Sequence, residues 1–185
     1  MSERSARSRA TILKAARELV QERGYGAVSM DGIAARARVG KPTLYRWWPS
    51  KAALILAAAL EEAGEVFVVP DTGDIRADLS TLVVRACEVL GDDDLRPLFA
   101  GVVGAAQSDP PTNAAVKEIH HALRGPNQER IIAAQLAGEL PQGDPELLED
   151  MLVGAMWYRT LITGGPIDRA FADTVVAKVL GEPTT

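Results

Sequence analysis

Residues 29–54 read SMDGIAARARVGKPTLYRWWPSKAAL, and they contain the most informative pattern in the chain. Ser29 is a favourable helix N-cap, and apolar residues follow it at helical spacing. Pro42 suits the first turn of a second, short helix, which we expect to include Trp47 and Trp48 and to end at Pro49. Two helices separated by a three-residue turn have the spacing of a helix-turn-helix, whose second helix enters the major groove of DNA.

The charge is distributed unevenly along the chain. The 185 residues carry a formal net charge of −5, which taken alone argues against a nucleic-acid binder. Residues 1–51 hold eleven Lys and Arg against four Asp and Glu, a formal charge of +7, whereas residues 52–185 hold nine against twenty-one, or −12. A basic segment joined to an acidic one is the usual electrostatic pattern of a DNA-binding module fused to a second module.

Composition and motifs exclude several other classes of protein. Hydrophobic residues make up 47% of the chain, too many for a disordered protein. Cys87 is the only cysteine, so no intrachain disulfide can form, which suits the cytoplasm. No apolar run is long enough to span a membrane. His120 and His121 are adjacent, so on a helix they point apart and make a poor metal pair. With no nucleophile–base pair or phosphate loop either, we expect no metal, no cofactor and no enzyme.

Apolar residues at helical spacing predict an all-α protein with about nine helices. Gly24 is expected to stop the first helix, and Gly125-Pro126 must kink or restart a long one at 112–138. We assign residues 1–48 to the helix-turn-helix domain and residues 49–74 to a fourth helix and a turn-rich joint. Residues 75–185 are assigned to a helical bundle for dimerisation and ligand binding.

The residues around the turn also resemble a known family. The run from Val39 to Leu54, VGKPTLYRWWPSKAAL, is similar to the DNA-binding domain of the tetracycline-repressor (TetR) family. Its most specific parts are Thr-Leu-Tyr, the aromatic Trp48 and Pro-Ser-Lys. The close resemblance covers about residues 9–60, and the remainder resembles the family in the layout of its helices.

The resemblance implies which residues bind the DNA backbone. Ser29 is expected to cap the second helix and bind a phosphate. Lys41 and Thr43 open the recognition helix and are expected to meet phosphates or base edges. Tyr45 and Lys51 are expected to bind further phosphates, Lys51 from the start of the fourth helix.

Two neighbouring positions vary across the family and are expected to set specificity here. Arg46 is suited to bind a guanine through O6 and N7, which is worth about 1–3 kcal/mol of discrimination. Trp47 is suited to pack on a thymine methyl or on the sugar-phosphate chain, whereas Trp48 is expected in the core.

Two positions in the turn depart from the family pattern. Arg38 stands where the family often has Gly, so a left-handed backbone there would cost about 1 kcal/mol. Its side chain is expected to face outward, where it could bind a phosphate. Gly40 replaces the usual Ser and loses a capping hydroxyl.

The resemblance further implies a homodimeric repressor that a small molecule releases from a palindromic operator in double-stranded DNA. The helices at 146–163 and 168–180 are expected to pair with the partner's copies, and the candidate contacts on the first are Met151, Ala155, Tyr158 and Ile162. The apolar wall expected for a hydrophobic or amphipathic effector is formed by Phe99, Val103, His120, Leu123 and Trp157. Two alternatives stay open: a DNA-binding regulator without effector control, and a helical-bundle enzyme or carrier with an incidental basic segment.

Overall fold

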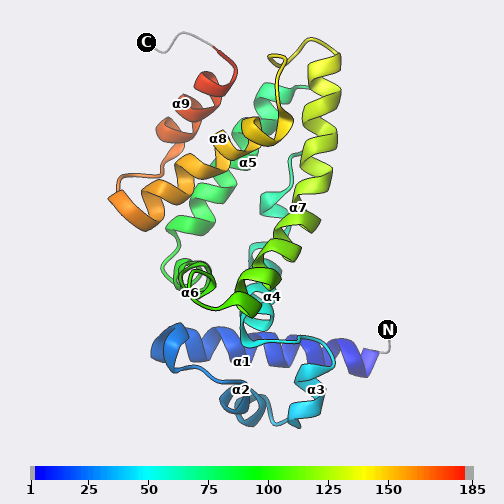
Figure 1. Ribbon diagram of the computed structural model, residues 1–185, viewed down its shortest axis with the longest axis vertical. Coiled ribbons are helices and arrows are strands. Elements are labelled where there is room, and N and C mark those ends of the chain that lie inside the picture. The colour runs from blue at the N-terminus through cyan, green and yellow to red at the C-terminus, as the bar shows by residue number, and fades with distance from the viewer. Residues whose placement is uncertain (1–2, 182–185) are drawn as a thin grey trace. The chain divides into compact units, whose positions relative to one another are not determined.

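The computed structural model describes residues 3–181, and the side chains of residues 5–181. The described part of the chain has nine α-helices and no strand, as predicted (Figure 1). The helices are α1 (Glu3–Ala27), α2 (Met30–Ala37), α3 (Lys41–Tyr45), α4 (Lys51–Ala63), α5 (Ile75–Gly91), α6 (Arg96–Ala106), α7 (Pro110–Leu136), α8 (Pro145–Tyr158) and α9 (Arg169–Val179). A 3₁₀ turn at Gly64–Phe67 follows α4, and a π-helical turn at Arg159–Thr163 follows α8.

The helices group into two compact units, each described by itself. The first consists of residues 1–64 and 93–119, and the second of residues 65–92 and 120–185. The first unit therefore holds α6 and the start of α7 in addition to α1–α4. This division by packing differs from the predicted boundary at residues 74 and 75, because α6 packs against α1 and α4.

The first unit is built on α1, which packs against α2, α4 and α6. One face of α1 is apolar, and its residues Ile12 and Leu13 are fully buried, as are Leu54 and Ile55 of α4. Figure 1 shows α1 running across the pair formed by α2 and α3. Gly24 interrupts α1 with φ 75° and ψ 157°, at the position where the sequence predicts a stop.

The second unit is a bundle in which α5 packs on α8 and α9, and α8 packs on α9. The apolar stripe of α5 forms its core, because six of its residues are buried: Ile75, Leu79, Leu82, Val83, Ala86 and Leu90. Leu152 and Met156 of α8 and Val176 of α9 pack into the same interior with at most 1% of their surface exposed.

One helix ends earlier than expected, and another continues through a proline. The sequence placed Trp47 and Trp48 inside the third helix, but α3 ends at Tyr45. The residue before a proline is disfavoured in helical conformation, and Trp48 precedes Pro49. The long helix, for which a kink or a restart was expected, continues through Pro126 as the single helix α7.

Candidate DNA-binding site

Ser29 starts the helix-turn-helix as the sequence predicts. Its backbone is extended, and its Oγ accepts a hydrogen bond of 3.1 Å from the amide N of Gly32. A hydroxyl that accepts one hydrogen bond still has its own proton to donate. The exposed Ser29 therefore caps α2 and keeps a donor available for a phosphate oxygen.

The turn between α2 and α3 has a left-handed backbone at Arg38. This residue has φ 56° and ψ 44°, and its amide N bonds to the carbonyl oxygens of Ala34 and Ala35. The amide N of Val39 bonds to the carbonyl oxygen of Ala34 at 3.0 Å. Gly40 precedes α3 without a side-chain cap, and Pro42 lies in its first turn, as predicted.

The short helix α3 has an inner and an outer face. Leu44 is fully buried and Trp48 is 6% exposed, which confirms that Trp48 is a core residue. On the outer face Lys41, Tyr45 and Arg46 are exposed, and Tyr45 keeps 52% of its surface accessible. This is the distribution that a helix needs to stay packed while presenting polar side chains to a groove.

Trp47 lies between these two faces. It is half-buried, its ring stacks on Trp48 with centroids 6.0 Å apart, and the Arg46 guanidinium lies 5.8 Å from its centroid. Its indole N–H is buried without a hydrogen-bond partner among the described residues. The Arg46 guanidinium and the Trp47 ring thus lie close together just after α3.

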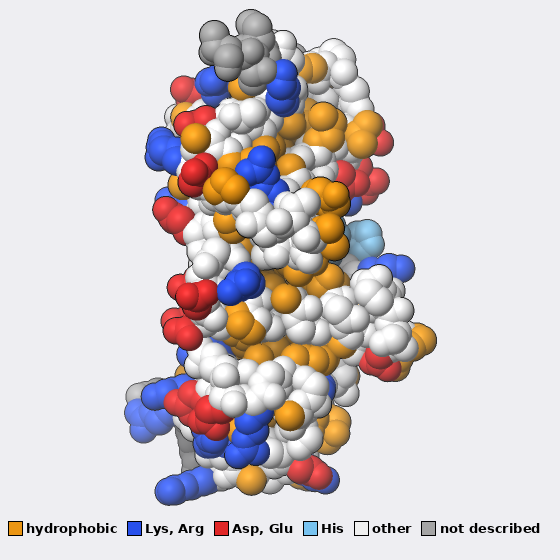
Figure 2. Space-filling model, turned by 90° about the vertical axis from the view of Figure 1, so that its left-hand side faces the viewer, with side chains coloured by type: hydrophobic (Ala, Val, Ile, Leu, Met, Phe, Trp, Pro, Cys, Tyr) orange, Lys and Arg blue, Asp and Glu red, His pale blue; other side chains and the backbone are white. Residues whose placement is uncertain are grey.

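Much of the positive charge of the first unit is paired within the unit, and Figure 2 shows Lys and Arg side chains there beside Asp and Glu. Arg36 binds Glu22 through two hydrogen bonds of 2.8 and 2.6 Å. Lys41 Nζ lies 2.5 Å from Asp31 Oδ1, and both side chains are more than half exposed. Such exposed pairs contribute little to stability, so Lys41 can exchange its carboxylate partner for a phosphate at small cost.

Lys51 lies at the start of α4 but is turned toward α1. Its Nζ donates a 3.1 Å hydrogen bond to the carbonyl oxygen of Tyr25 and lies 4.2 Å from the centre of that ring. Partial burial lowers the pKa of Lys51, against the nearby charge of Asp109, which raises it. Burial also raises the pKa of Tyr25. The ammonium is thus engaged within the protein here, and its phosphate contact stays a prediction.

The residues predicted at the dimer interface lie on α8 and the turn after it. Met151, Tyr158 and Ile162 are exposed by 50%, 59% and 69%, and Ala155 is half-buried. Leu147, on the same helix, is 58% exposed. Figure 2 shows hydrophobic side chains reaching the surface on the α8 and α9 side of the second unit.

The residues predicted to line an effector pocket are divided between the two units. Phe99, which is buried, and Val103 belong to the first unit, while His120, Leu123 and Trp157 belong to the second. A groove of about 510 Å³ does occur in the second unit, but residues of α5 and α9 and the N-cap of α5 line it, and none of the five predicted residues does. The composition of the groove is polar, with Arg76, Arg85, Arg169, Asp173 and Glu88 among its lining residues.

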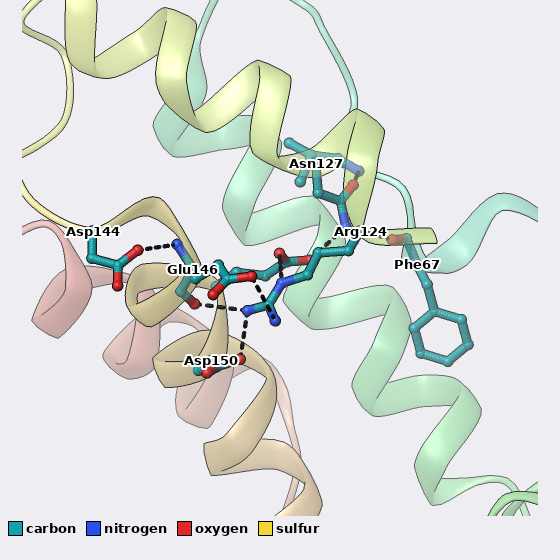
Figure 3. A network of polar contacts seen from close by, with 8 residues as sticks. Phe67, Arg124, Asn127, Asp144, Glu146 and Asp150 are labelled. Carbon is teal, nitrogen blue, oxygen red and sulfur yellow. Dashed lines mark hydrogen bonds and ion pairs between the residues drawn. The ribbon is translucent and has the colours of Figure 1, made fainter. Parts of the chain in front are cut away.

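Patterns in the sequence do not indicate the polar network that joins α7, α8 and the segment after α4 (Figure 3). Asn127 is 4% exposed; its Oδ1 accepts from the amide N of Val69 at 2.8 Å, and its Nδ2 donates to the carbonyl oxygen of Phe67 at 3.0 Å. The same Nδ2 donates to the buried Glu149 at 3.1 Å, and the other oxygen of Glu149 accepts from Arg124 at 2.8 Å. Polar residues in a helix pattern are expected at the surface, so only the tertiary contacts reveal this role.

Potential metal ligands, apolar helices and the thiol of Cys87 are the remaining features of the described part of the chain. No group of three potential metal ligands lies together there, and no described helix is long and apolar enough to cross a membrane. Burial raises the pKa of the Cys87 thiol to about 11. Cys87 is therefore protonated near neutral pH and is a poor nucleophile.

A capped helix, a tight left-handed turn and a short helix with an exposed basic and aromatic face define a helix-turn-helix DNA-binding protein. Comparison with known proteins identifies the family within this class. Residues 12–58 match the family described as bacterial regulatory proteins, tetR family, and residues 69–179 match the tetracyclin repressor-like C-terminal domain. The chain belongs to the TetR family of transcriptional regulators.

Three relatives show how far the similarity extends. The HTH-type transcriptional regulator YdeS of Bacillus subtilis is 32% identical over 89% of this chain and 84% of its own length. The DNA-binding transcriptional repressor TetR of Mycobacteroides abscessus is 31% identical over 92% of this chain and 90% of its own. The crystal structure of the TetR family transcription regulator SCO0332 is 33% identical, with a TM-score of 0.79 over 96% of this chain and 99% of that one. The similarity thus extends over 89–96% of the chain, which is a helix-turn-helix regulator of the repressor type.

Proposed function

We propose that the protein represses transcription as a homodimer on a palindromic operator, and that a small hydrophobic or amphipathic molecule releases it. The exposed face of α3, with Lys41, Tyr45 and Arg46 outward and Leu44 inward, is the observation that carries the proposal. In a symmetric dimer two such helices enter successive major grooves about 34–36 Å apart. The regulator acts in the cytoplasm, on the nucleoid, and has no catalytic role.

Each predicted DNA contact has a definite part in this proposal. Ser29, Tyr45 and Lys51 bind phosphates. Lys41 and Thr43, at the start of the recognition helix, meet phosphates or base edges. Phosphate contacts fix the register of the protein on the duplex, whereas base contacts carry the sequence information. The specificity for the operator sequence is therefore assigned chiefly to Arg46 and Trp47. Lys51 donates one of its three ammonium protons to the Tyr25 carbonyl oxygen, which leaves two for a phosphate.

The exposed apolar side chains of α8 support its place in the dimer interface. Leu147, Met151 and Tyr158 are spaced by four and seven residues, so they lie on one face of the helix. Gly154 lies between them with nothing within 4 Å of the place where a Cβ would stand, which leaves room for a partner helix. Apolar clusters of this kind on a soluble surface are typical of protein interfaces.

A charge placed in this stripe tests the dimer. In Met151→Glu a carboxylate would be buried at the interface, so we expect the mass in solution to fall from twice 19.7 kDa toward 19.7 kDa. Ala133→Glu, on the exposed surface of α7, is the matched control and should leave the mass unchanged. Light scattering after size exclusion measures both. A Met151→Glu protein of unchanged mass would place the interface elsewhere.

Effector control is tested by release from DNA. Candidate apolar and amphipathic molecules that raise the melting temperature of the protein are added to its complex with a protected promoter fragment. We expect at least one of them to weaken the complex, because a ligand bound more tightly by the DNA-incompetent state shifts the population toward it. A stabilising ligand that leaves operator affinity unchanged would favour the alternative of a regulator without effector control.

A further inference from the structure

Arg38 has a backbone conformation that its side chain makes costly. It is the only residue other than glycine with a positive φ in the described part of the chain. The left-handed region brings Cβ of an L-residue close to its own carbonyl oxygen, and glycine avoids this cost. The hydrogen bonds of this turn use only backbone atoms of Ala34, Ala35, Arg38 and Val39, so glycine would form the same turn. The turn itself therefore gives no reason for an arginine.

The side chain of Arg38 is exposed and makes no ion pair, hydrogen bond or ring contact with a described residue. The neighbouring cations differ from it. Arg36, two residues before, is held by Glu18 and Glu22, and Lys41, three residues after, is paired with Asp31. Arg38 thus offers a whole guanidinium, with five N–H donors, to a partner outside the chain.

The position of Arg38 indicates what that partner is. It ends α2 and stands three residues before Lys41, the first residue of the recognition helix. A helix in the major groove has phosphates along both edges of the groove, and an arginine fork matches the geometry of phosphate oxygens. We propose that Arg38 binds a phosphate of the operator beside the groove that α3 enters. This inference rests on the proposed insertion of α3 and adds a contact that the sequence resemblance does not supply.

Salt-dependent binding tests the contact. The probe is the promoter fragment that the protein protects from nuclease, with a random duplex of equal length beside it. Arg38→Asn removes the charge but keeps a residue that tolerates the left-handed region, and Arg38→Lys keeps the charge. We expect Arg38→Asn to bind both duplexes at least fivefold more weakly at about 100 mM salt. For Arg38→Asn the plot of log affinity against log salt should become less steep by about 0.9 for each half-site. The affinity and the slope of Arg38→Lys should stay close to those of the parent protein.

Two controls separate a phosphate contact from other effects. Arg36→Gln removes the same charge two residues away, and we expect it to leave the slope unchanged. Arg38→Gly should melt no lower than the parent protein, so a loss of affinity in that variant cannot come from unfolding.

Three outcomes would overturn the proposal. An Arg38→Asn protein with unchanged affinity would show that there is no contact. A loss confined to the protected fragment, without a change of slope, would show a base contact instead. An equal effect of Arg36→Gln would show that only the net charge matters. Failure of α3 itself to bind would be recognised separately, because Thr43→Ala and Arg46→Ala would then leave affinity unchanged.

Discussion

Ser29 carries a structural and a proposed functional role on one hydroxyl, and substitution can separate them. Ser29→Ala removes the bond to Gly32, so we expect a loss of about 1 kcal/mol and a melting temperature lower by about 2–4 °C. Ser29→Asp keeps a capping oxygen, and its stability should return to that of the parent protein. Its operator affinity should remain low, because a carboxylate repels phosphate. Calorimetry and DNA titration of the two variants measure these effects, and tight operator binding by Ser29→Asp would refute the phosphate role.

Single residues with a strong local preference were predictable from the sequence. The cap at Ser29 and the buried Trp48 follow from local chemistry or a short pattern, and the structure has them where expected. The partner of Lys51 was not predictable. Tyr25 lies 26 residues earlier in the chain, and only the folded first unit brings the two together.

At the scale of elements, α6 meets α1 through a very close contact at Gly101. A Cβ added there would stand 2.5 Å from Cβ of Tyr25 and 2.9 Å from its Cγ. We therefore expect Gly101→Ala to destabilise the protein by about 1–3 kcal/mol through overpacking.

Gly104, on the same helix, supplies the control for this contact. Nothing lies within 4 Å of a Cβ at Gly104, so Gly104→Ala should stabilise the protein by about 0.4–1 kcal/mol. Chemical denaturation of both variants gives the two values. Equal effects would mean that the contact between Gly101 and Tyr25 does not limit the packing of α1 on α6.

One buried amide, that of Asn127, binds two backbone groups of the segment that follows α4. Asn127 satisfies the amide N of Val69 and the carbonyl oxygen of Phe67 and also binds Glu149, all with little access to water. Asn127→Ala leaves these groups without a partner, and we expect a loss of about 1–3 kcal/mol in unfolding free energy. Glu129→Ala, an exposed neighbour on α7, should stay within about 0.5 kcal/mol of the parent. A small effect of Asn127→Ala in denaturation would show that water replaces the amide.

The order of the elements was predictable, but the end of α3 and the continuity of α7 through Pro126 were not. Apolar periodicity revealed nine helices because each buries one face, and that face leaves a pattern in the sequence. The passage of α7 through Pro126 depends on partners far along the chain. Arg124 and Asn127, on either side of the proline, are anchored to α8, and Asn127 also to the 67–69 segment. Local propensity contains no information about such anchors.

At the scale of the whole molecule, the charge pattern and the packing divide the chain differently. The formal charge changes sign between residues 1–51 and 52–185, whereas the first packing unit also takes in residues 93–119. The sequence shows the charge of each segment, but the packing of α6 on α1 and α4 is visible only in the folded structure. The chain crosses from one unit to the other near residues 64, 92 and 119, so several covalent connections link the DNA-binding helices to the second unit.

The proposed function depends on sequence-specific binding through α3, which a single titration can test. The affinity of the parent protein and of the double variant Thr43→Ala, Arg46→Ala for the protected promoter fragment is measured at one fixed salt concentration. Circular dichroism checks that the variant is folded. We expect an affinity at least tenfold lower for the variant, because an Arg–guanine contact contributes about 1–3 kcal/mol in each half-site. An unchanged affinity in the folded variant would contradict the assignment of α3 as the recognition helix.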